Sequence, residues 1–341
     1  EEESGYDYPF QAISLSYRKN EEICTAVAFV TETLESQILL EAFCEMEQNA
    51  KKIILLNWKN IMHLTTPVEQ LSPEKTAPMQ QAFDDRDYEK TQLLFTKIFD
   101  VSLGGYLLNP MRDSYQVDDI ARDYKSMMLP SKKELIDKKH PMVTDGVLSD
   151  AGKKIMGYEA YISREAIQPL SDKLTELEMM DLYREIEIPT MFALHDMEVR
   201  GIHVDSKALK EYGDQLVGRI EELQESIYKE AGEEFNINSP KQLGVVLFDH
   251  MKLEGAKKTK TGYSTSVEVL EKIEHLYPII PMILEYRQLT KLKSTYADGL
   301  ANFIQDDQRI HGKFNQTITA TGRISSTEPN LQNIPIRMDL G

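Results

Sequence analysis

The C-terminal part of the chain concentrates side chains that form hydrogen bonds. Residues 317–337 hold alternating threonines, an arginine directly after a glycine, and a group of asparagine and glutamine residues between two prolines. No pair of titratable groups at catalytic spacing and no cluster of metal ligands occurs in this segment. Hydroxyl, amide and guanidinium groups offer many hydrogen-bond donors and acceptors. The segment therefore predicts a surface that holds an extended polar molecule rather than one that breaks a bond.

Residues 257–266 form a second candidate surface, which combines cations, small hydroxyls and the start of a helix. Lys257 and Lys258 are flexible cations, and Ser264 and Thr265 supply hydroxyls just before the apolar positions of a short helix. The sequence from Thr265 to Glu268 reads as a capping box. Cations and free backbone N–H groups at a helix start both favour phosphate. The alternative is a solvated loop with an ordinary helix cap.

Residues 286–296 predict a helix with a basic stripe opposite an apolar stripe. Helical spacing places Arg287, Lys291 and Ser294 on one face. The other face holds the apolar stripe, made by Leu289, Leu292 and Tyr296. A stripe of this kind is usually a solvated surface, and binding to phosphate is the second interpretation.

These segments resemble the signatures of bacterial DNA polymerase I, a member of polymerase family A. Residues 319–335 match the family pattern T-x-T-G-R-[LI]-S-S-[TS]-[ED]-P-N-L-Q-N-I-P almost letter for letter. Residues 257–266 match K-K-T-x-x-G-x-[ST]-T-S, and residues 286–296 match Y-R-x-L-x-K-L-x-x-T-Y. Residues 235–243 match F-N-[IL]-x-S-x-K-Q-L. The similarity is strong from Phe235 onward and weaker before Leu170.

The resemblance implies that the chain holds a primer–template duplex beside a polymerase active site. Gly322 gives backbone freedom to Arg323, whose guanidinium can check base-pair geometry through minor-groove acceptors that recur at every base pair. A turn-rich loop whose amides satisfy its own backbone is the structural alternative. The implied DNA-binding residues are Lys257, Lys258, Ser264, Thr265, Arg287, Lys291, Lys293, Thr319, Thr321, Arg323, Asn330, Gln332 and Asn333.

The N-terminal part is similar to the proofreading exonuclease of polymerase I, with its metal ligands altered. The motifs N-x-K-x-D and F-D-T-x-L-x-x-Y-[IL]-L-[ND] correspond to residues around Asn57 and Asp100. Asn60 and Ile162 stand where the resemblance places metal-binding aspartates, and the D-x-E motif is missing before Phe10. Divalent metals require charged oxygen ligands. We therefore expect a ribonuclease H-like fold without exonuclease activity. In it Asp100 is expected to be a buried hydrogen-bonding group, and Asp118 and Asp119 a helix-capping pair.

Composition is typical of a soluble globular protein. The chain has 341 residues, of which 41% are hydrophobic and 28% charged, enough for two or three domains. No apolar run approaches the roughly 18 residues that span a membrane, and no secretory leader opens the chain. Cys24 and Cys44 are expected to be reduced thiols in a cytoplasmic protein. The seven histidines are scattered without zinc-site spacing, and no phosphate loop of the Walker type or nucleophile motif is present.

The net charge of −17 is unevenly distributed along the sequence. Residues 236–341 contain 13 basic and 11 acidic side chains, which leaves 26 basic and 45 acidic side chains for residues 1–235. A local basic surface attracts phosphates even where the total charge is negative. The charge distribution is therefore compatible with DNA binding by the C-terminal part.

Hydrophobic periodicity predicts the elements that position these residues. Strands are expected at 10–17, 23–30, 52–56, 202–204 and 313–321, and helices at 35–48, 174–198, 206–231 and 279–305, with a loop at 130–150. The expected fold class is an α/β ribonuclease H-like domain followed by a mainly α-helical thumb and the first strand and loop of a polymerase palm. The expected domains are 1–170, 171–305 and 306–341.

The resemblance implies a parent DNA-directed DNA polymerase that uses Mg²⁺ and deoxynucleoside triphosphates in replication and repair. The family's catalytic aspartates follow the 319–335 motif, so we expect these 341 residues to bind DNA without polymerising and to hold no cofactor. Catalytic and metal-binding residues are therefore expected to be absent, and the chain is expected to be monomeric. Two alternatives are a stand-alone DNA-binding module and an active 3′–5′ exonuclease whose ligands lie elsewhere.

Overall fold

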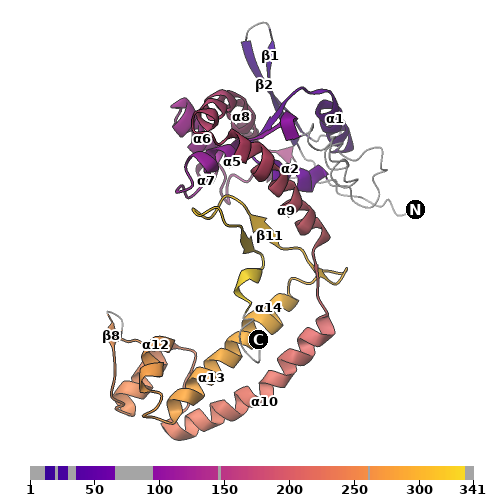
Figure 1. The fold of residues 1–341 in the computed structure, drawn as a ribbon. Coiled ribbons are helices and arrows are strands. Elements are labelled where there is room, and N and C mark those ends of the chain that lie inside the picture. The colour runs from indigo at the N-terminus through magenta and orange to yellow at the C-terminus, as the bar shows by residue number, and fades with distance from the viewer. Residues whose placement is uncertain are drawn as a thin grey trace, which may run out of the picture. The chain divides into compact units, whose positions relative to one another are not determined.

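The computed structural model describes residues 12–19, 22–29, 36–65, 95–144, 147–259 and 262–334. The chain forms two compact units (Figure 1). Unit 1 comprises Glu1–Arg200 and Phe314–Ser326, and unit 2 comprises Gly201–Lys313 and Thr327–Gly341. The predicted boundary at residue 170 does not coincide with this division, because it lies inside helix α8 (Asp150–Glu176).

Unit 1 contains two pairs of strands among its described residues. Strands β1 (Ala12–Lys19) and β2 (Glu22–Phe29) form an antiparallel hairpin, and β3 (Ile53–Leu55) pairs in parallel with β4 (Ile98–Asp100). The predicted strands at 10–17, 23–30 and 52–56 are thus present, shifted by two residues or fewer. Within the described ranges they belong to separate two-stranded sheets rather than to one larger sheet.

Helices and short strands surround these pairs and contribute most of the core of unit 1. The helix at 35–48 is confirmed as α1, within a residue of its predicted ends. Helix α1 spans Ser36–Asn49. The other elements of unit 1 are α2 (Trp58–Thr65), α5 (Val101–Leu108), α6 (Val117–Lys125), α7 (Lys132–Leu135), β5 (Val143–Thr144), β6 (Val147–Leu148), the π-helical turn η2 (Leu182–Glu187) and α9 (Ile188–Arg200).

Helix α8 starts much earlier than the sequence pattern predicts. The Ser149 hydroxyl caps it by accepting a hydrogen bond from the Gly152 backbone N–H at 3.1 Å. Its core-facing residues, Ile155, Ile162, Ala166, Leu170 and Leu174, are fully buried and follow helical spacing. The predicted helix at 174–198 is therefore wrong in its start, since α8 ends at Glu176 and η2 and α9 follow after a short break.

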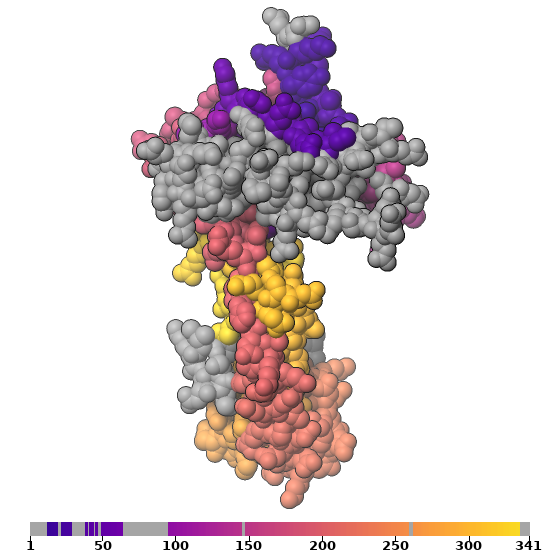
Figure 2. Space-filling view, turned by 90° about the vertical axis from the view of Figure 1, so that its right-hand side faces the viewer, coloured from indigo at the N-terminus to yellow at the C-terminus, as the bar shows by residue number. Residues whose placement is uncertain are grey.

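Unit 2 is mainly helical and is built on two long helices that lie side by side (Figures 1 and 2). Helix α10 (Ser206–Ala231) begins at the predicted cap, where the Asp205 carboxylate accepts from the Ala208 N–H at 2.9 Å. It ends at Gly232, which has a φ of +76°, a conformation that glycine adopts without strain. Its predicted apolar face packs against α13 (Ile279–Lys291) in one cluster that includes Leu216, Ile227 and Ile283.

The helix that carries the predicted basic stripe changes form along its length. After α13 it continues as the π-helical turn η5 (Leu292–Ala297) and then as α14 (Asp298–Ala301). The smaller elements are the paired strands β7 (Ile202–His203) and β10 (Arg309–Ile310), α11 (Pro240–Val245), the π-helical turn η3 (Val246–His250), β8 (Lys258–Thr259), β9 (Gly262–Tyr263), α12 (Val267–Leu270), and the 3-10 turns η4 (Glu271–Ile273) and η6 (Leu331–Asn333).

The strand predicted at 313–321 is shorter than its alternating pattern suggests. Strand β11 spans Lys313–Asn315 and pairs with β12 (Ser325–Thr327). Beyond Asn315 the side chains bond to other backbone groups and the chain turns at Gly322, which has a φ of +76°. Ile318, expected on the apolar face, is 61% exposed. Side-chain hydrogen bonds therefore replace the strand ladder in this segment.

Candidate nucleic-acid interface

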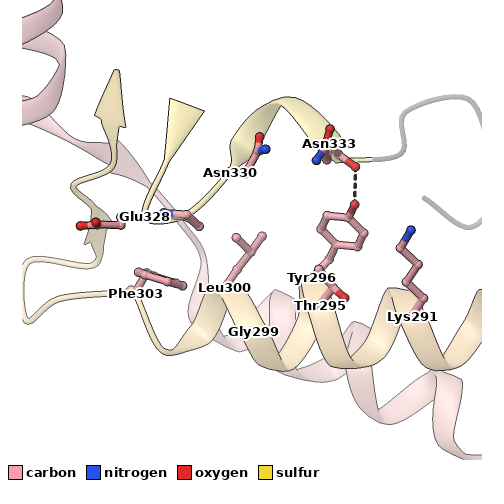
Figure 3. Close-up of a pocket in the computed structure, with 10 residues that line it drawn as sticks. Lys291, Thr295, Tyr296, Gly299, Leu300, Phe303, Glu328, Asn330 and Asn333 are labelled. Atoms are coloured by element: carbon pink, nitrogen blue, oxygen red, sulfur yellow. Dashed lines mark hydrogen bonds between the residues drawn. The ribbon is translucent and has the colours of Figure 1, made fainter. Parts of the chain in front are cut away.

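A pocket of about 870 Å³ in unit 2 brings together residues that the sequence places about 40 positions apart. One wall is the helix formed by α13, η5 and α14, and the other is the loop that leads into η6 (Figure 3). Lys291 lines the first wall, and Asn330 and Asn333 line the second. The remaining lining residues are Thr295, Tyr296, Gly299, Leu300, Phe303, Glu328 and Pro329.

Hydrogen bonds fix the loop wall of this pocket against the helix. The Tyr296 hydroxyl donates to the backbone carbonyl of Asn333 (Figure 3). The Asn330 side chain caps η6 by accepting from the Gln332 backbone N–H at 3.0 Å. The Asn330 amide therefore has a structural bond through its oxygen, while its NH₂ group can still donate. Asn333 and Gln332 are exposed.

The charged groups around the pocket differ in how they are paired. Lys291 is exposed at its rim. The Lys293 ammonium instead lies 2.7 Å from the Asp298 carboxylate, and the Glu328 carboxylate pairs with Lys313. Lys291 is consequently the predicted cation that lines this pocket, whereas Lys293 would have to exchange its Asp298 partner before it could bind phosphate.

The predicted lysine loop of unit 2 forms a short hairpin. Strands β8 and β9 pair between Lys258 and Tyr263, and the Ser264 N–H donates to the Lys257 carbonyl at 2.8 Å. Lys257 and Lys258 are exposed and Ser264 is half-buried. Ser266, rather than Thr265, occupies the N-cap position of α12, and its side chain makes no capping hydrogen bond. The predicted capping box is therefore not formed, because the helix begins one residue later than predicted and its third residue is Val269. Lys260 lies outside the described residues.

Arg287 supports this hairpin from the neighbouring helix. Its guanidinium donates to the Thr265 carbonyl at 2.7 Å and to the Ile237 carbonyl at 3.2 Å. Burial lowers the pKa of Arg287 from its usual value. Thr265 is buried, and its hydroxyl lies 3.5 Å from the same guanidinium. In this structure Arg287 is half-buried and its guanidinium binds backbone carbonyls, whereas Lys291, one turn later on the same helix, is exposed.

Three other predicted DNA-binding residues lie in unit 1, on the turn that follows β11. The Thr319 hydroxyl donates to the Arg323 carbonyl at 2.5 Å, and the Tyr106 hydroxyl donates to the Thr319 carbonyl at 2.8 Å. Thr321 and Arg323 are exposed. The turn therefore presents the Arg323 guanidinium outward while the Thr319 side chain holds the backbone in shape.

The residues at the altered exonuclease positions differ in burial and in hydrogen bonding. The aspartate position predicted at Asn60 is wrong by one residue, because the fifth position of N-x-K-x-D counted from Asn57 is Ile61. Asn60 is exposed in the first turn of α2, where its N–H donates to the Asn57 side chain at 3.0 Å, and Ile162 is fully buried. Asp100 is a buried hydrogen-bonding group, as predicted, and accepts from the N–H groups of Trp58 and Leu103 at 2.7 Å. Burial raises its pKa to about 7, against the opposing effect of these N–H donors.

The predicted capping pair lies at the start of α6. The Asp119 carboxylate accepts from the Gln116 N–H at 3.3 Å and forms a capping box with Gln116. Asp118 lies in the same first turn, where the helix dipole favours a negative charge. Glu1 to Glu3 and the segment before Phe10 lie outside the described residues.

The described ranges contain no group of three or more histidine, cysteine, aspartate or glutamate side chains that could hold a metal ion. None of the described helices is long and apolar enough to cross a membrane.

Sequence reasoning located part of the pocket and missed the rest. It identified Lys291, Asn330 and Asn333 separately, and the structure brings them together. It assigned Tyr296 to an apolar face, although the hydroxyl on a half-buried tyrosine requires a partner. Thr295 and Glu328 belong to the matched motifs but were not predicted to bind, and Phe303 lies outside those motifs. The place of all three in the pocket depends on the π-helical turn η5 and on the path of the loop.

Comparison with known proteins places these features in a family. Residues 206–341 match the model for DNA polymerase family A. DNA polymerase I of Bacillus subtilis (strain 168) is 44% identical over 251 residues, which cover 71% of this chain and 28% of that protein. DNA polymerase I of Lactococcus lactis subsp. lactis (strain IL1403) is 39% identical over 304 residues, which cover 86% of this chain and 32% of that protein. The chain thus spans less than a third of the length of these two relatives.

A solved structure gives the same result for the fold. The polymerase domain of Pol1 from M. smegmatis, in complex with DNA primer–template and dNTP, is similar with a TM-score of 0.60 and 36% sequence identity. The similarity covers 71% of this chain and 39% of that chain. From the family match, the identities to curated relatives and this shared fold together, residues 206–341 belong to DNA polymerase family A, and the chain is similar to bacterial DNA polymerases I.

Proposed function

We propose that this chain is part of a DNA-directed DNA polymerase and that it binds primer–template duplex. The observation that carries the proposal is the pocket that Lys291, Asn330 and Asn333 line together. A cation and neutral amides are the groups that bind phosphates and the acceptor edges of bases, respectively. The relatives named above are DNA polymerases, and the similar M. smegmatis domain is bound to primer–template and dNTP.

The pocket suits a duplex better than a compact small molecule because its two walls carry different chemistry. Lys291 and Thr295 on the helix offer a positive charge and a hydroxyl to a phosphate backbone. The asparagines on the loop offer amide donors, which suit the minor-groove acceptors present at every base pair. Binding of this kind is independent of sequence, as a polymerase requires. The exposed Lys257 and Lys258 extend the cationic surface of unit 2.

Arg323 is proposed to contact the primer terminus from the minor-groove side, together with Thr321. Both are exposed on a turn whose backbone is held by Thr319 and Tyr106. Arg287 and Thr265 are proposed to act by positioning the lysine hairpin, since their polar groups bond to one another. Ser264, Lys293 and Gln332 remain proposed DNA contacts.

Unit 1 is proposed to be a ribonuclease H-like domain that has lost proofreading activity. Two positions that the family resemblance assigns to metal-binding aspartates hold isoleucine, namely Ile61, which follows Asn60, and the buried Ile162. Because neither position carries a carboxylate, two charged oxygen ligands of a two-metal site are missing. The parent polymerase is proposed to use Mg²⁺ and deoxynucleoside triphosphates, in the cytoplasm and as a monomer.

Binding of the chain to a fluorescein-labelled primer–template tests the proposal. If four to six phosphates are neutralised, log K falls by about 4 to 5 per decade of salt. A flat salt response rejects the assignment of the basic residues. In a parallel assay with a 5′-labelled primer, Mg²⁺ and deoxynucleotides, an unchanged primer is expected. A shortened primer would instead indicate an active exonuclease and a different set of ligands.

A further inference from the structure

Unit 1 holds the backbone of Phe314 by both of its polar groups. The Glu198 carboxylate in α9 accepts from the Phe314 N–H at 2.6 Å, and the Lys59 ammonium in α2 donates to the Phe314 carbonyl. Lys59 and Glu198 also pair directly, with Nζ and Oε1 2.6 Å apart. We call these two residues the Phe314 clamp. It holds the chain nine residues before Arg323, in strand β11, which leads into the turn that presents Arg323.

The clamp is buried and electrostatically strong. Glu198 is 4% exposed and Lys59 is 17% exposed, so water screens their interaction little. Burial alone would raise the pKa of Glu198, but hydrogen bonds from His63 and Lys59 and from the Phe314 N–H lower it overall. Glu198 is therefore ionised at neutral pH. Removing one member of such a pair leaves a buried charge without its partner, which is strongly destabilising.

Two further contacts from unit 1 hold the same segment after Phe314. The Gln316 side chain donates to the Glu187 carbonyl at 2.8 Å, and the Tyr106 hydroxyl donates to the Thr319 carbonyl at 2.8 Å. Four elements of unit 1, namely α2, α5, η2 and α9, thus contact one stretch of ten residues that ends at Arg323.

We infer that unit 1 serves as a scaffold that positions the Arg323 turn, with Lys59 and Glu198 as its principal positioning residues. Lys59 is the lysine of the N-x-K-x-D motif, whose aspartate position holds Ile61 two residues later. Lys59 of this motif therefore has a structural role that does not require a metal. The inference rests on the proposed function only for the role of Arg323 in DNA binding; the holding of the segment stands on the contacts themselves.

Tryptic cleavage after Arg323 without DNA tests the scaffold independently of any ligand. Proteolysis reports the population of the locally opened segment when reclosing is fast. Lys59→Met is expected to speed this cleavage by about 5- to 30-fold, the factor that corresponds to one or two kcal/mol of local stability. The rate is measured as the appearance of the new N-terminus at Ile324, relative to cleavage after the exposed Lys154 in α8.

Lys125→Met is the matched control, since Lys125 forms a half-buried ion pair with Glu165 in the same unit, at 3.3 Å. It is expected to leave the relative cleavage rate unchanged. Glu198→Gln keeps one carbonyl oxygen to accept from the Phe314 N–H, so it should restore part of what Glu198→Leu loses. Equal rates after Arg323 in Lys59→Met, Lys125→Met and the parent protein would overturn the inference.

If the clamp variants unfold unit 1, cleavage at both sites will accelerate equally. Tyr106→Phe then provides a second test of the scaffold. This variant removes only a hydroxyl and keeps the ring against Tyr115. It is expected to accelerate cleavage after Arg323 by about fivefold, as for the loss of one hydrogen bond. No acceleration in a folded Tyr106→Phe protein would overturn the scaffold.

The DNA arm compares recessed primer–template with blunt duplex. The clamp variants are expected to lose affinity selectively for the recessed end, as is expected of Arg323→Ala. Faster cleavage with unchanged DNA affinity supports the scaffold and counts against the proposed role of Arg323. A different outcome would contradict the scaffold but not the role of Arg323. In that outcome Arg323→Ala loses affinity selectively for the recessed end, while the clamp variants show neither faster cleavage nor altered DNA binding.

Discussion

The Tyr296 hydroxyl donates a hydrogen bond to the backbone carbonyl of Asn333, and this bond ties the helix wall of the pocket to its loop wall (Figure 3). Tyr296 lies in the π-helical turn η5, and Asn333 ends the 3-10 turn η6. The distance between the cation and the amides of the candidate DNA site therefore depends on a side chain that does not itself have to contact DNA.

Replacing Tyr296 by phenylalanine removes this bond and leaves the aromatic ring in place. A single hydrogen bond contributes about 0.5–1.5 kcal/mol, so we expect primer–template affinity to fall by about 3- to 10-fold. Fluorescence anisotropy measures the change. Tyr228→Phe is the control, because its hydroxyl donates to the Phe235 carbonyl at 2.9 Å elsewhere in unit 2. Equal losses in both variants would point to a general loss of stability instead.

Lys291→Ala removes the predicted cation that lines the pocket. If Lys291 neutralises one phosphate, the salt dependence of log K should weaken by about one unit per decade. The loss should be uniform across DNA sequences, since a phosphate contact reads none. Lys210→Ala, which changes an exposed lysine on α10, should leave the slope as in the parent protein. An unchanged slope in Lys291→Ala would remove that residue from the interface.

Arg323→Ala should weaken binding to a recessed primer end more than binding to blunt duplex. An arginine that contacts the terminal base pairs contributes on the order of 1–3 kcal/mol, so we expect at least about a fivefold difference between the two losses. Competition binding with the two unlabelled DNAs measures it. Comparable losses on both DNAs would reject a role at the primer terminus.

Asp100 should make stability depend on pH between about 4 and 7. Its pKa is raised to about 7 in the folded protein by burial, so the unfolded chain releases this proton at lower pH than the folded chain does. The free energy of unfolding should therefore fall as pH rises through this window. Asp100→Asn should lose this component while keeping one acceptor oxygen at the start of α5.

Urea unfolding of the parent protein and of Asp100→Asn at several pH values measures the contribution of Asp100 as the difference between their free energies of unfolding. The difference is needed because His195 acts in the opposite direction: burial and the nearby His63 lower its pKa to about 4, so it destabilises the folded state as pH falls below about 6.5. A difference between the two proteins that is independent of pH would show that Asp100 is ionised throughout.

The sequence allowed the elements with clear periodicity and caps to be predicted closely. Helix α10 has both an aspartate cap and a terminal glycine, and its observed bounds agree with the prediction. The start of α8 was missed because Gly152 and Gly157 interrupt its apolar pattern. A glycine is required at Gly152, because an added Cβ would lie 2.6 Å from the Met142 carbonyl oxygen.

The sequence predicted which residues belong to the site better than it predicted how those residues are arranged. Motif matches identified Lys291, Asn330 and Asn333, but no local pattern indicates that Tyr296 joins them. Arg287 shows the converse, since helical spacing placed it beside Lys291 while the structure turns its guanidinium toward Thr265. Whether an arginine binds a ligand or a neighbouring loop depends on acceptors distant in sequence, such as the Ile237 carbonyl.

Hydrogen–deuterium exchange with and without primer–template at low salt locates the bound DNA directly. We expect slower exchange in residues 288–300 and 328–334, which form the two walls of the pocket, and no change in the middle of α8. Saturated binding with unchanged exchange in both walls would contradict the assignment of this pocket to DNA.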